Sequence, residues 1–264
     1  MPTVDFSLNN RVAIITGGSK GIGRAIALAF AEHGADIALA ARGREALEKT
    51  RGEVEATGRR CLAIAADLSR EEDWPRIVDE TAQAFGGIDI LVNNAAAADK
   101  YGPIAKTGSE GWDLVMRVNL KASFFLSKLC RPHMQKRGGG SVLHITSNEA
   151  VRPSYGLGAY SVSKGALVTL TQVCAKEWAA EQIRVNCIAP GLVRTELAAG
   201  LVQMVEKSGL YPNPMNRIGE PGEIAGLALY LVSPAGRYAT GQTFVVDGGE
   251  LVLAPTDPRP RRVD

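Results

Sequence analysis

The sequence has few of the residues that build metal centres and disulfide frameworks. It contains only four cysteines and three histidines in 264 residues. The histidines lie far apart and lack cysteine or carboxylate neighbours at ligand spacing, which predicts no metal site. The cysteines are equally scattered, so we expect reduced, mostly buried thiols and a cytoplasmic location. They are Cys61, Cys130, Cys174 and Cys187.

Charge and hydrophobicity exclude two further classes of partner. The net charge is +2 and no long basic block occurs, so the chain has no electrostatic footprint for nucleic acid. No apolar run approaches the length of a membrane span, and the first ten residues lack the charged and apolar regions of a signal peptide. We therefore expect a protein that acts on a small molecule, without nucleic-acid or membrane partners.

Short apolar runs alternate with helical patterns along nearly the whole chain. The apolar runs predict strands at residues 11–16, 36–41, 61–66, 88–92, 141–146, 184–188 and 243–246. Helices are predicted after the first strand to about residue 33, and at residues 45–57, 71–85, 111–131, 160–180, 196–207 and 223–232. This alternation is typical of an α/β fold, a doubly wound parallel sheet of about seven strands with helices on both faces. No linker or repeat interrupts it, so we predict a single domain over residues 1–264, with a short irregular tail from about residue 250.

A glycine-rich loop follows the first predicted strand. It carries Gly17, Gly21 and Gly23 and leads directly into a helix. Strand, glycine loop and helix together form the context that a dinucleotide fingerprint requires. The glycines allow a tight turn, and the N–H groups and positive dipole end of the helix suit a pyrophosphate. The loop therefore predicts a dinucleotide site.

Tyr160 and Lys164 stand four residues apart in a predicted helix, and Ser147 lies thirteen residues before the tyrosine. Residues four apart share a helix face, so the phenol and the ammonium can point into one site. A free tyrosine has a pKa of about 10, and a nearby positive charge favours the phenolate. Such a phenol can exchange a proton during reversible carbonyl reduction. Ser147 ends a buried strand, where open α/β sheets bind ligands. The alternative for the pair alone is a surface tyrosine beside a solvated lysine.

Together these motifs resemble the short-chain dehydrogenase/reductase family over about residues 8–250, nearly the whole chain. The glycine pattern that begins at Thr16 is this family's variant of the fingerprint. Further matches follow in the family's order. They are Asp67, the segment Asn93-Asn94-Ala95-Ala96, in which Ala96 replaces a glycine, Asn119, the set of Ser147, Tyr160 and Lys164, the Pro190-Gly191 turn with Thr195, and Asp247-Gly248-Gly249. The resemblance implies a Rossmann fold.

The resemblance also implies roles for these residues. Tyr160 would be the general acid or base, Ser147 would bond the substrate oxygen, and Lys164 would lower the Tyr160 pKa and bind the nicotinamide ribose. Asn119 would hold a water that connects Lys164 to solvent; the alternative is a helix asparagine that bonds its own backbone. Besides Tyr160 and Lys164, the expected cofactor-binding residues are Gly17, Ser19, Lys20, Gly21, Ile22, Gly23, Arg42, Asp67, Leu68, Asn94, Ala95, Ala96, Pro190, Gly191, Val193 and Thr195.

The end of the second predicted strand indicates which dinucleotide to expect. An NAD site usually carries an acidic residue about 20 residues after the glycine loop begins, where it bonds the ribose 2′-OH. The strand here ends in Leu39-Ala40-Ala41 without an acid, Arg42 follows it, and Lys20 lies inside the glycine loop. Asp36 lies at the far end of the strand and should not reach the ribose. Two cations that flank the ribose suit a 2′-phosphate, so the sequence predicts NADP(H). The alternative is two solvated surface cations.

The first functional hypothesis is an enzyme, an NADP(H)-dependent carbonyl reductase that also oxidises secondary alcohols. An alternative is a 3-oxoacyl-[acyl-carrier-protein] reductase. Arg131, Lys136 and Arg137 offer part of the basic patch that an acidic carrier would want, but Glu181 stands where such reductases tend to have a cation. A third hypothesis is a non-catalytic dinucleotide-sensing protein, which would not need a complete catalytic set.

The substrate pocket is expected between residues 148–158 and a lid segment, residues 192–215. Glu149 and Arg152 are polar residues that could meet substrate or water. The apolar lid residues either face the substrate or pack into the core or a subunit interface; they are Leu197, Leu201, Val202, Met204, Val205 and Tyr211. Apolar residues between positions 114 and 129 and at 251–253, together with the resemblance, predict a homotetramer.

Overall fold

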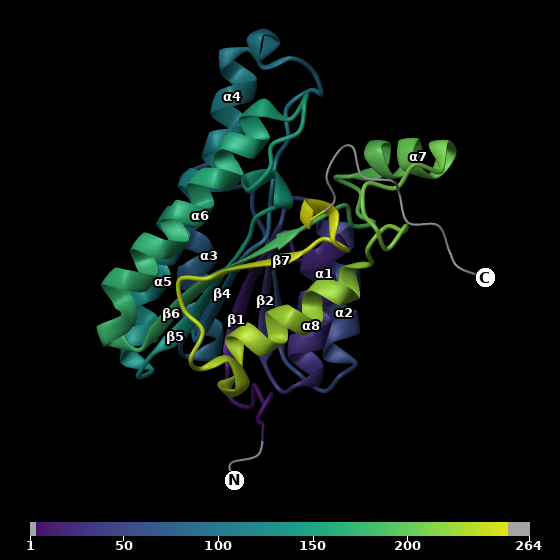
Figure 1. Cartoon of the computed structure of the whole chain (residues 1–264). Coiled ribbons are helices and arrows are strands. Elements are labelled where there is room, and N and C mark those ends of the chain that lie inside the picture. The colour runs from purple at the N-terminus through teal and green to yellow at the C-terminus, as the bar shows by residue number, and fades with distance from the viewer. Residues whose placement is uncertain (1–3, 253–264) are drawn as a thin grey trace, which may run out of the picture.

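The computed structural model describes residues 4–252, which form one parallel sheet covered by helices on both faces (Figure 1). The sheet has seven strands in the order β3-β2-β1-β4-β5-β6-β7. They are β1 (Val12–Thr16), β2 (Asp36–Ala41), β3 (Cys61–Ala65), β4 (Ile90–Asn93), β5 (Gly140–Ile145), β6 (Ile183–Pro190) and β7 (Thr243–Val246). Every residue of β1 is buried, which explains its uninterrupted apolar sequence, because helices cover both faces of a parallel strand. The fold class predicted from the sequence is confirmed.

The strand order reverses beside β1. This strand pairs with β2 on one side and with β4 on the other, so the chain crosses over between β3 and β4. In doubly wound sheets such a switch point opens a crevice outside the carboxyl ends of the strands, where ligands bind. The segments that follow β1, β4 and β5 therefore meet at the edge of the sheet where a site is expected.

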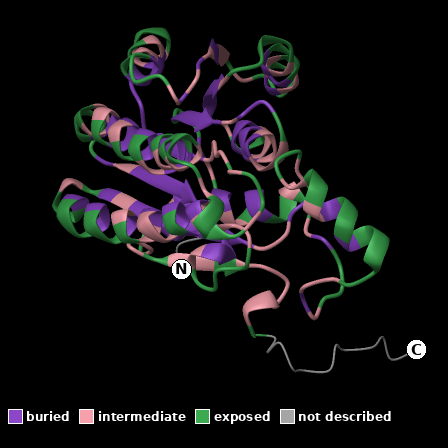
Figure 2. Ribbon diagram, turned by 90° about the horizontal axis from the view of Figure 1, so that it is seen from above, coloured by how far each residue is buried: buried purple, intermediate pink, exposed green. Residues whose placement is uncertain are grey.

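Helices form one layer on each face of the sheet. On one face lie α1 (Gly21–Glu32), α2 (Arg44–Glu55) and α8 (Pro221–Val232), and on the other lie α3 (Asp73–Phe85), α5 (Ala122–Lys136) and α6 (Gly158–Trp178). Each layer has its own core, built around Phe30 on the first face and Leu126 on the second. Seen from above, the buried strands run between helices whose outward faces are exposed (Figure 2). The short helix α7 (Ala199–Ser208) stands away from the sheet, beyond its carboxyl edge (Figure 1).

The helix predicted at residues 111–131 is longer and less regular in the structure than the sequence indicated. It consists of α4 (Ser109–Met116), a π-helical turn (Arg117–Lys121) and α5. It also continues past Pro132, although an interior proline costs a helix about 3 kcal/mol. The side chain of Met134, beyond the proline, is fully buried, and this packing offsets the cost. Hydrophobic periodicity indicates neither feature, because a π turn and a tolerated proline depend on tertiary contacts.

Most other boundaries differ from the predicted ones by one or two residues, and three further differences concern the helix before α8, β6 and the tail. The predicted helix at 196–207 begins at Ala199, because the Thr195 hydroxyl oxygen accepts the N–H of Ala198 at 3.3 Å and closes a turn first. β6 continues to Pro190, where it still pairs with Val246 of β7. Of the predicted tail, residues Glu250–Val252 form a short 3-10 turn, and the remainder lies outside the described residues.

Residues 4–252 contain no helix with the length and apolar character needed to cross a membrane. The same part of the chain holds no group of three or more histidine, cysteine, aspartate or glutamate side chains that could hold a metal ion. The prediction of a single domain over the whole chain stays a prediction.

Candidate active site at the carboxyl edge of the sheet

The glycine loop after β1 is too tight for larger residues. Gly17 has a φ of +64°, in the left-handed region, and a Cβ on Gly23 would lie 2.4 Å from the Gly17 carbonyl oxygen. Asn94, after β4, donates from Nδ2 to the Thr16 carbonyl oxygen at 2.9 Å and so joins the two loops at the switch point. Helix α1 begins without a side-chain cap, which leaves the N–H groups of its first turn available to an anion.

The other predicted cofactor-binding residues lie at the same edge of the sheet. They are Ser19, Gly21 and Ile22 at the start of α1, Arg42 after β2, Asp67 and Leu68 after β3, Ala95 and Ala96 after β4, and Pro190, Gly191, Val193 and Thr195 at and after the end of β6. The lid segment approaches the glycine loop closely, since a Cβ on Gly21 would lie 3.2 Å from Cγ2 of Thr195. Segments far apart in the sequence therefore surround one crevice.

Ser147, Tyr160 and Lys164 meet at this edge. Ser147 lies just after β5, and Tyr160 and Lys164 lie near the start of α6. The side chains of Ser147 and Tyr160 lie close enough to interact, since Ser147 lowers the Tyr160 pKa. Nζ of Lys164 lies 5.5 Å from the centroid of the Tyr160 ring. Lys164 is only 2% exposed, and its ammonium donates to the Ile145 carbonyl oxygen at 2.8 Å.

Burial controls the protonation of this cluster. It raises the pKa of Tyr160 to about 12; the hydrogen bond with Ser147 opposes the increase, and the charge of Glu149 adds to it. Burial also lowers the pKa of Lys164 to about 8. Both changes favour the uncharged form, because a charged group loses hydration when it is buried. The pKa of Tyr160 therefore changes in the direction opposite to the one expected from Lys164, because burial dominates. A role for Lys164 in lowering the Tyr160 pKa stays a prediction.

Asn119 lies in the π-helical turn and is almost completely buried. Its Oδ1 accepts the N–H of Ala97 at 2.8 Å, and its Nδ2 donates to the Ala97 carbonyl oxygen and to Oγ of Ser163, both at 2.9 Å. The side chain therefore joins the loop after β4 to α6, at the residue before Lys164. The alternative of an asparagine that bonds its own backbone is wrong. A role for Asn119 in holding a water stays a prediction.

Glu149 is a buried carboxylate whose role the sequence left open. It accepts the N–H of Ser154 at 2.7 Å, the hydroxyl of Ser154 at 2.6 Å and the hydroxyl of Ser161 at 2.9 Å. Its own N–H donates to Oγ of Ser147 at 3.2 Å. Glu149 thus organises the loop before α6, next to both Ser147 and Tyr160. Two serines that follow a glutamate at short range were the only available sequence signal.

The two cations predicted to bind a ribose phosphate have different surroundings. Arg42 is exposed, and it forms no ion pair within residues 4–252. Lys20 forms an ion pair with Glu196 of the lid segment. Asp36, at the opposite end of β2, is bound by two arginines that precede β3. Asp36 thus lies at the end of β2 away from the glycine loop, and the expectation that it does not reach the ribose stays a prediction.

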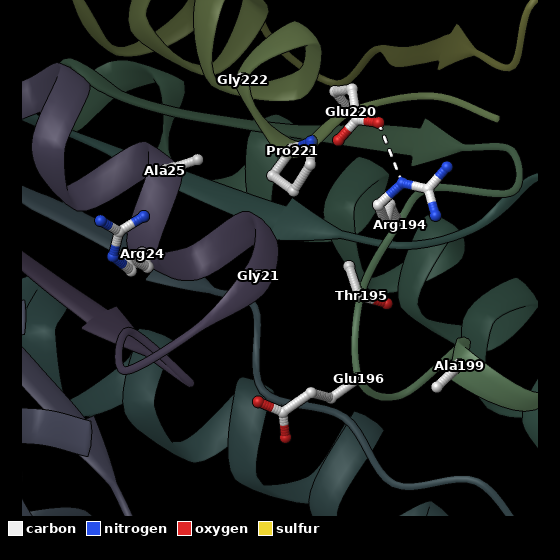
Figure 3. Close-up of a pocket in the computed structure, with 10 residues that line it drawn as sticks. All are labelled: Gly21, Arg24, Ala25, Arg194, Thr195, Glu196, Ala199, Glu220, Pro221 and Gly222. Carbon is white, nitrogen blue, oxygen red and sulfur yellow. Dashed lines mark hydrogen bonds and ion pairs between the residues drawn. The ribbon is translucent and has the colours of Figure 1, made fainter. Parts of the chain in front are cut away.

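The lid segment borders a cleft of about 600 Å³ beside α1. Figure 3 shows the residues that line it: Gly21, Arg24, Ala25, Arg194, Thr195, Glu196, Ala199, Glu220, Pro221 and Gly222. Within α7, Val202 and Val205 are buried, whereas Leu197 before the helix and Met204 inside it are more than half exposed. The apolar lid residues therefore divide between core packing and an open face.

The fold and these residues define a dinucleotide-binding protein with a serine, tyrosine and lysine site at its switch point. The family model described as Enoyl-(Acyl carrier protein) reductase matches residues 17–250. Dehydrogenase/reductase SDR family member 4 of Oryctolagus cuniculus is 39% identical over 244 residues, which cover 92% of this chain and 94% of the relative. The chain belongs to the short-chain dehydrogenase/reductase family of oxidoreductases, as the sequence motifs predicted.

Two solved structures illustrate the likeness in space. L-sorbose reductase from Gluconobacter frateurii, complexed with NADPH and L-sorbose, has a TM-score of 0.87 and 34% identity, and covers 95% of this chain and 100% of its own. A 3-ketoacyl-(acyl-carrier-protein) reductase from Brucella melitensis, complexed with NADH, has a TM-score of 0.86 and 32% identity, with coverage of 92% and 99%.

Proposed function

We propose that this protein is an NADP(H)-dependent oxidoreductase that transfers a hydride between nicotinamide and a ketone or secondary alcohol, with Tyr160 as general acid or base. The observation that carries the proposal is that Ser147, Tyr160 and the buried Lys164 lie together at the same sheet edge as the glycine loop. The two solved neighbours, bound to NADPH and NADH, support a nicotinamide cofactor.

The crevice fits such a cofactor, because a glycine loop without room for side chains lets a pyrophosphate approach the backbone. A bound nicotinamide dinucleotide would supply the hydride. In the proposed complex, the Gly17–Gly23 loop and the start of α1 hold the pyrophosphate, and Asp67 and Leu68 hold the adenine ring. The Pro190-Gly191 turn and Thr195 hold the nicotinamide carboxamide.

The protein's own contribution is to hold the substrate oxygen and move a proton. The side chains of Ser147 and Tyr160 interact, so a carbonyl oxygen placed between them can accept from both hydroxyls. A phenol with a pKa of about 12 is protonated at neutral pH and can donate its proton as hydride arrives. Lys164 binds the nicotinamide ribose, and Asn119 holds the loop after β4 against α6.

The preference for NADP(H) is supported by the end of β2. The end of β2 has no acidic residue that could accept a hydrogen bond from a ribose 2′-OH, and the exposed Arg42 follows it directly. Its guanidinium can bind a phosphate in bidentate fashion. Lys20 would be the second phosphate ligand, once it separates from Glu196.

The 3-oxoacyl-carrier reductase remains the second candidate because the neighbour from Brucella melitensis acts on that class of substrate. One observation weakens it. Arg131 of the basic patch forms an ion pair with Glu181, so its charge is neutralised and attracts an acidic carrier less. A dinucleotide sensor is disfavoured, since a sensor gains nothing from burying a lysine beside a tyrosine and a serine.

We also propose a cytoplasmic homotetramer. Leu114 on α4 and Phe124 on α5 are 47% and 37% exposed, which leaves an apolar surface along the long helix for a second copy to cover. Light scattering that gives a monomer at micromolar concentration would contradict the tetramer.

A panel assay of the purified protein tests the function. NADPH and NADH are each offered with simple ketones, ketoses and a 3-oxoacyl thioester, and the loss of reduced nicotinamide absorbance is followed. The proposal expects turnover of a ketone, with a higher kcat/KM for NADPH than for NADH. Turnover of the thioester alone would favour the carrier reductase, and binding of cofactor without any turnover would favour the sensor.

A further inference from the structure

Two neighbouring residues of the lid segment, Arg194 and Glu196, form ion pairs. Arg194 pairs with Glu206 of α7 at 2.8 Å and with Glu220, before α8, at 3.1 Å. Glu196 pairs in the other direction, with Lys20 of the glycine loop. Figure 3 shows Arg194 and Glu196 on either side of Thr195, pointing away from each other. Within residues 4–252, Lys20–Glu196 is the only ion pair that joins the lid segment to the glycine loop.

The Lys20–Glu196 pair lies in the open. Lys20 is 56% exposed and Glu196 is 68% exposed at their side chains. The two backbones are close, because a Cβ on Gly21 would already touch the Thr195 side chain. An exposed ion pair contributes little to stability and can separate easily. The carboxylate therefore competes for the ammonium of Lys20 without locking it permanently.

We propose that Glu196 is a specificity-determining residue that limits the affinity for a dinucleotide carrying a 2′-phosphate. This inference rests on the proposed function, in which Lys20 is a phosphate ligand. A phosphate that reaches Lys20 must displace the Glu196 carboxylate or lie beside it, and two anions around one cation repel each other. A dinucleotide without the phosphate makes no demand on Lys20. Glu196 thus acts against NADPH and leaves NADH unaffected.

The test is the variant Glu196→Gln, which keeps the size of the side chain and removes its charge. The dissociation constants of NADPH and NADH are measured by titration calorimetry at low and high salt. Because an exposed ion pair is weak, we expect NADPH to bind about two- to five-fold more tightly than to the parent. NADH binding should not change, and the gain for NADPH should shrink at high salt.

Glu206→Gln is the matched control. It removes the same charge from the same lid segment and breaks an ion pair with Arg194, but it does not touch Lys20. We expect no change for either cofactor. A further variant, Lys20→Gln combined with Glu196→Gln, should show a smaller gain for NADPH than Glu196→Gln alone, because the cation for which the two anions compete is gone.

Several outcomes would overturn the inference. Unchanged or weaker NADPH binding in Glu196→Gln would show that the carboxylate does not compete. Equal changes for NADPH and NADH would show a general effect of the lid. The parent protein tests the proposed function separately, because no affinity for either dinucleotide, or a preference for NADH, refutes the NADP(H) assignment. The role of Glu196 is tested by the ratio of the NADPH dissociation constants of variant and parent.

Discussion

Replacing Tyr160 with phenylalanine is the most direct test of the proposed chemistry. Phenylalanine keeps the ring that lies 5.5 Å from the Lys164 ammonium and removes only the hydroxyl that interacts with Ser147. Loss of a general acid typically slows a reaction about a hundred- to ten-thousand-fold, which raises the barrier by about 3 to 5 kcal/mol. Loss of one hydrogen bond changes the free energy of unfolding by only about 1 kcal/mol. Activity and stability should therefore separate clearly.

The assay compares kcat for ketone reduction, the dissociation constant of NADPH and the urea midpoint in parent and variant. We expect kcat to fall by at least about a hundred-fold while NADPH binding stays within a factor of about two. Tyr155→Phe is the control. Tyr155 lies five residues away, is 70% exposed, and makes an edge-to-face contact with Tyr101 at 6.3 Å. The Tyr155→Phe variant also loses one tyrosine hydroxyl, but we expect it to keep its activity.

Near-normal turnover in Tyr160→Phe would refute the reasoning, because the Tyr160 hydroxyl would then not be the proton donor. A comparable loss in Tyr155→Phe would also count against it, since the effect would then belong to the mouth of the crevice. A loss of NADPH binding in Tyr160→Phe would mean that the hydroxyl serves the cofactor and not the proton transfer.

Three further predictions follow from the charges. Glu149→Gln should lower the Tyr160 pKa, since the carboxylate raises it, and alcohol oxidation measured at pH 9 should rise about two- to ten-fold. Burial lowers the His144 pKa to about 3, whereas the pKa of this histidine in the unfolded chain is about 6.5, so the unfolded chain binds the proton first as the pH falls. In urea titrations we expect about 2 kcal/mol of the free energy of unfolding to be lost between pH 7 and 5. The loss should be smaller in His144→Gln. Ala41→Asp with Arg42→Leu should reverse the cofactor preference in kcat/KM, because the new carboxylate repels a 2′-phosphate and accepts from a 2′-OH; an unchanged preference would show that Arg42 is a solvated surface charge.

Much of the fold could be predicted because the central strands of the sheet are buried on both faces. Each strand of this sheet is a short apolar run between turns in the sequence, and β2 and β7 have the predicted boundaries. The errors fall where tertiary contacts override local pattern. The π turn at Arg117–Lys121 places Asn119 toward Ala97 and Ser163, partners that are 22 and 44 residues away in the sequence. No local pattern contains that information.

The candidate site shows the same division. Spacing and motif order were enough to bring Ser147, Tyr160 and Lys164 to one place, because each lies at a fixed position relative to a strand end or a helix start. Glu149 was named only as a residue that could meet substrate or water, and Glu196 was missed as a functional candidate. Their importance comes from partners that only folding supplies, namely the serines around Glu149 and Lys20 beside Glu196.

The direction of the pKa changes was the least predictable property of the site, and it bears on the direction of the reaction. Sequence spacing gives the separation of Tyr160 and Lys164 but not their burial, and burial outweighs the attraction between a cation and a phenolate. A phenol with a pKa of about 12 holds its proton at neutral pH. A lysine with a pKa of about 8 loses part of its charge just above neutral pH. On the proposed mechanism, reduction consumes a proton from Tyr160, whereas oxidation first requires that proton to leave. The surroundings of Tyr160 therefore prepare this site for reduction of a carbonyl, and oxidation has to work against the same burial and the same Glu149 charge.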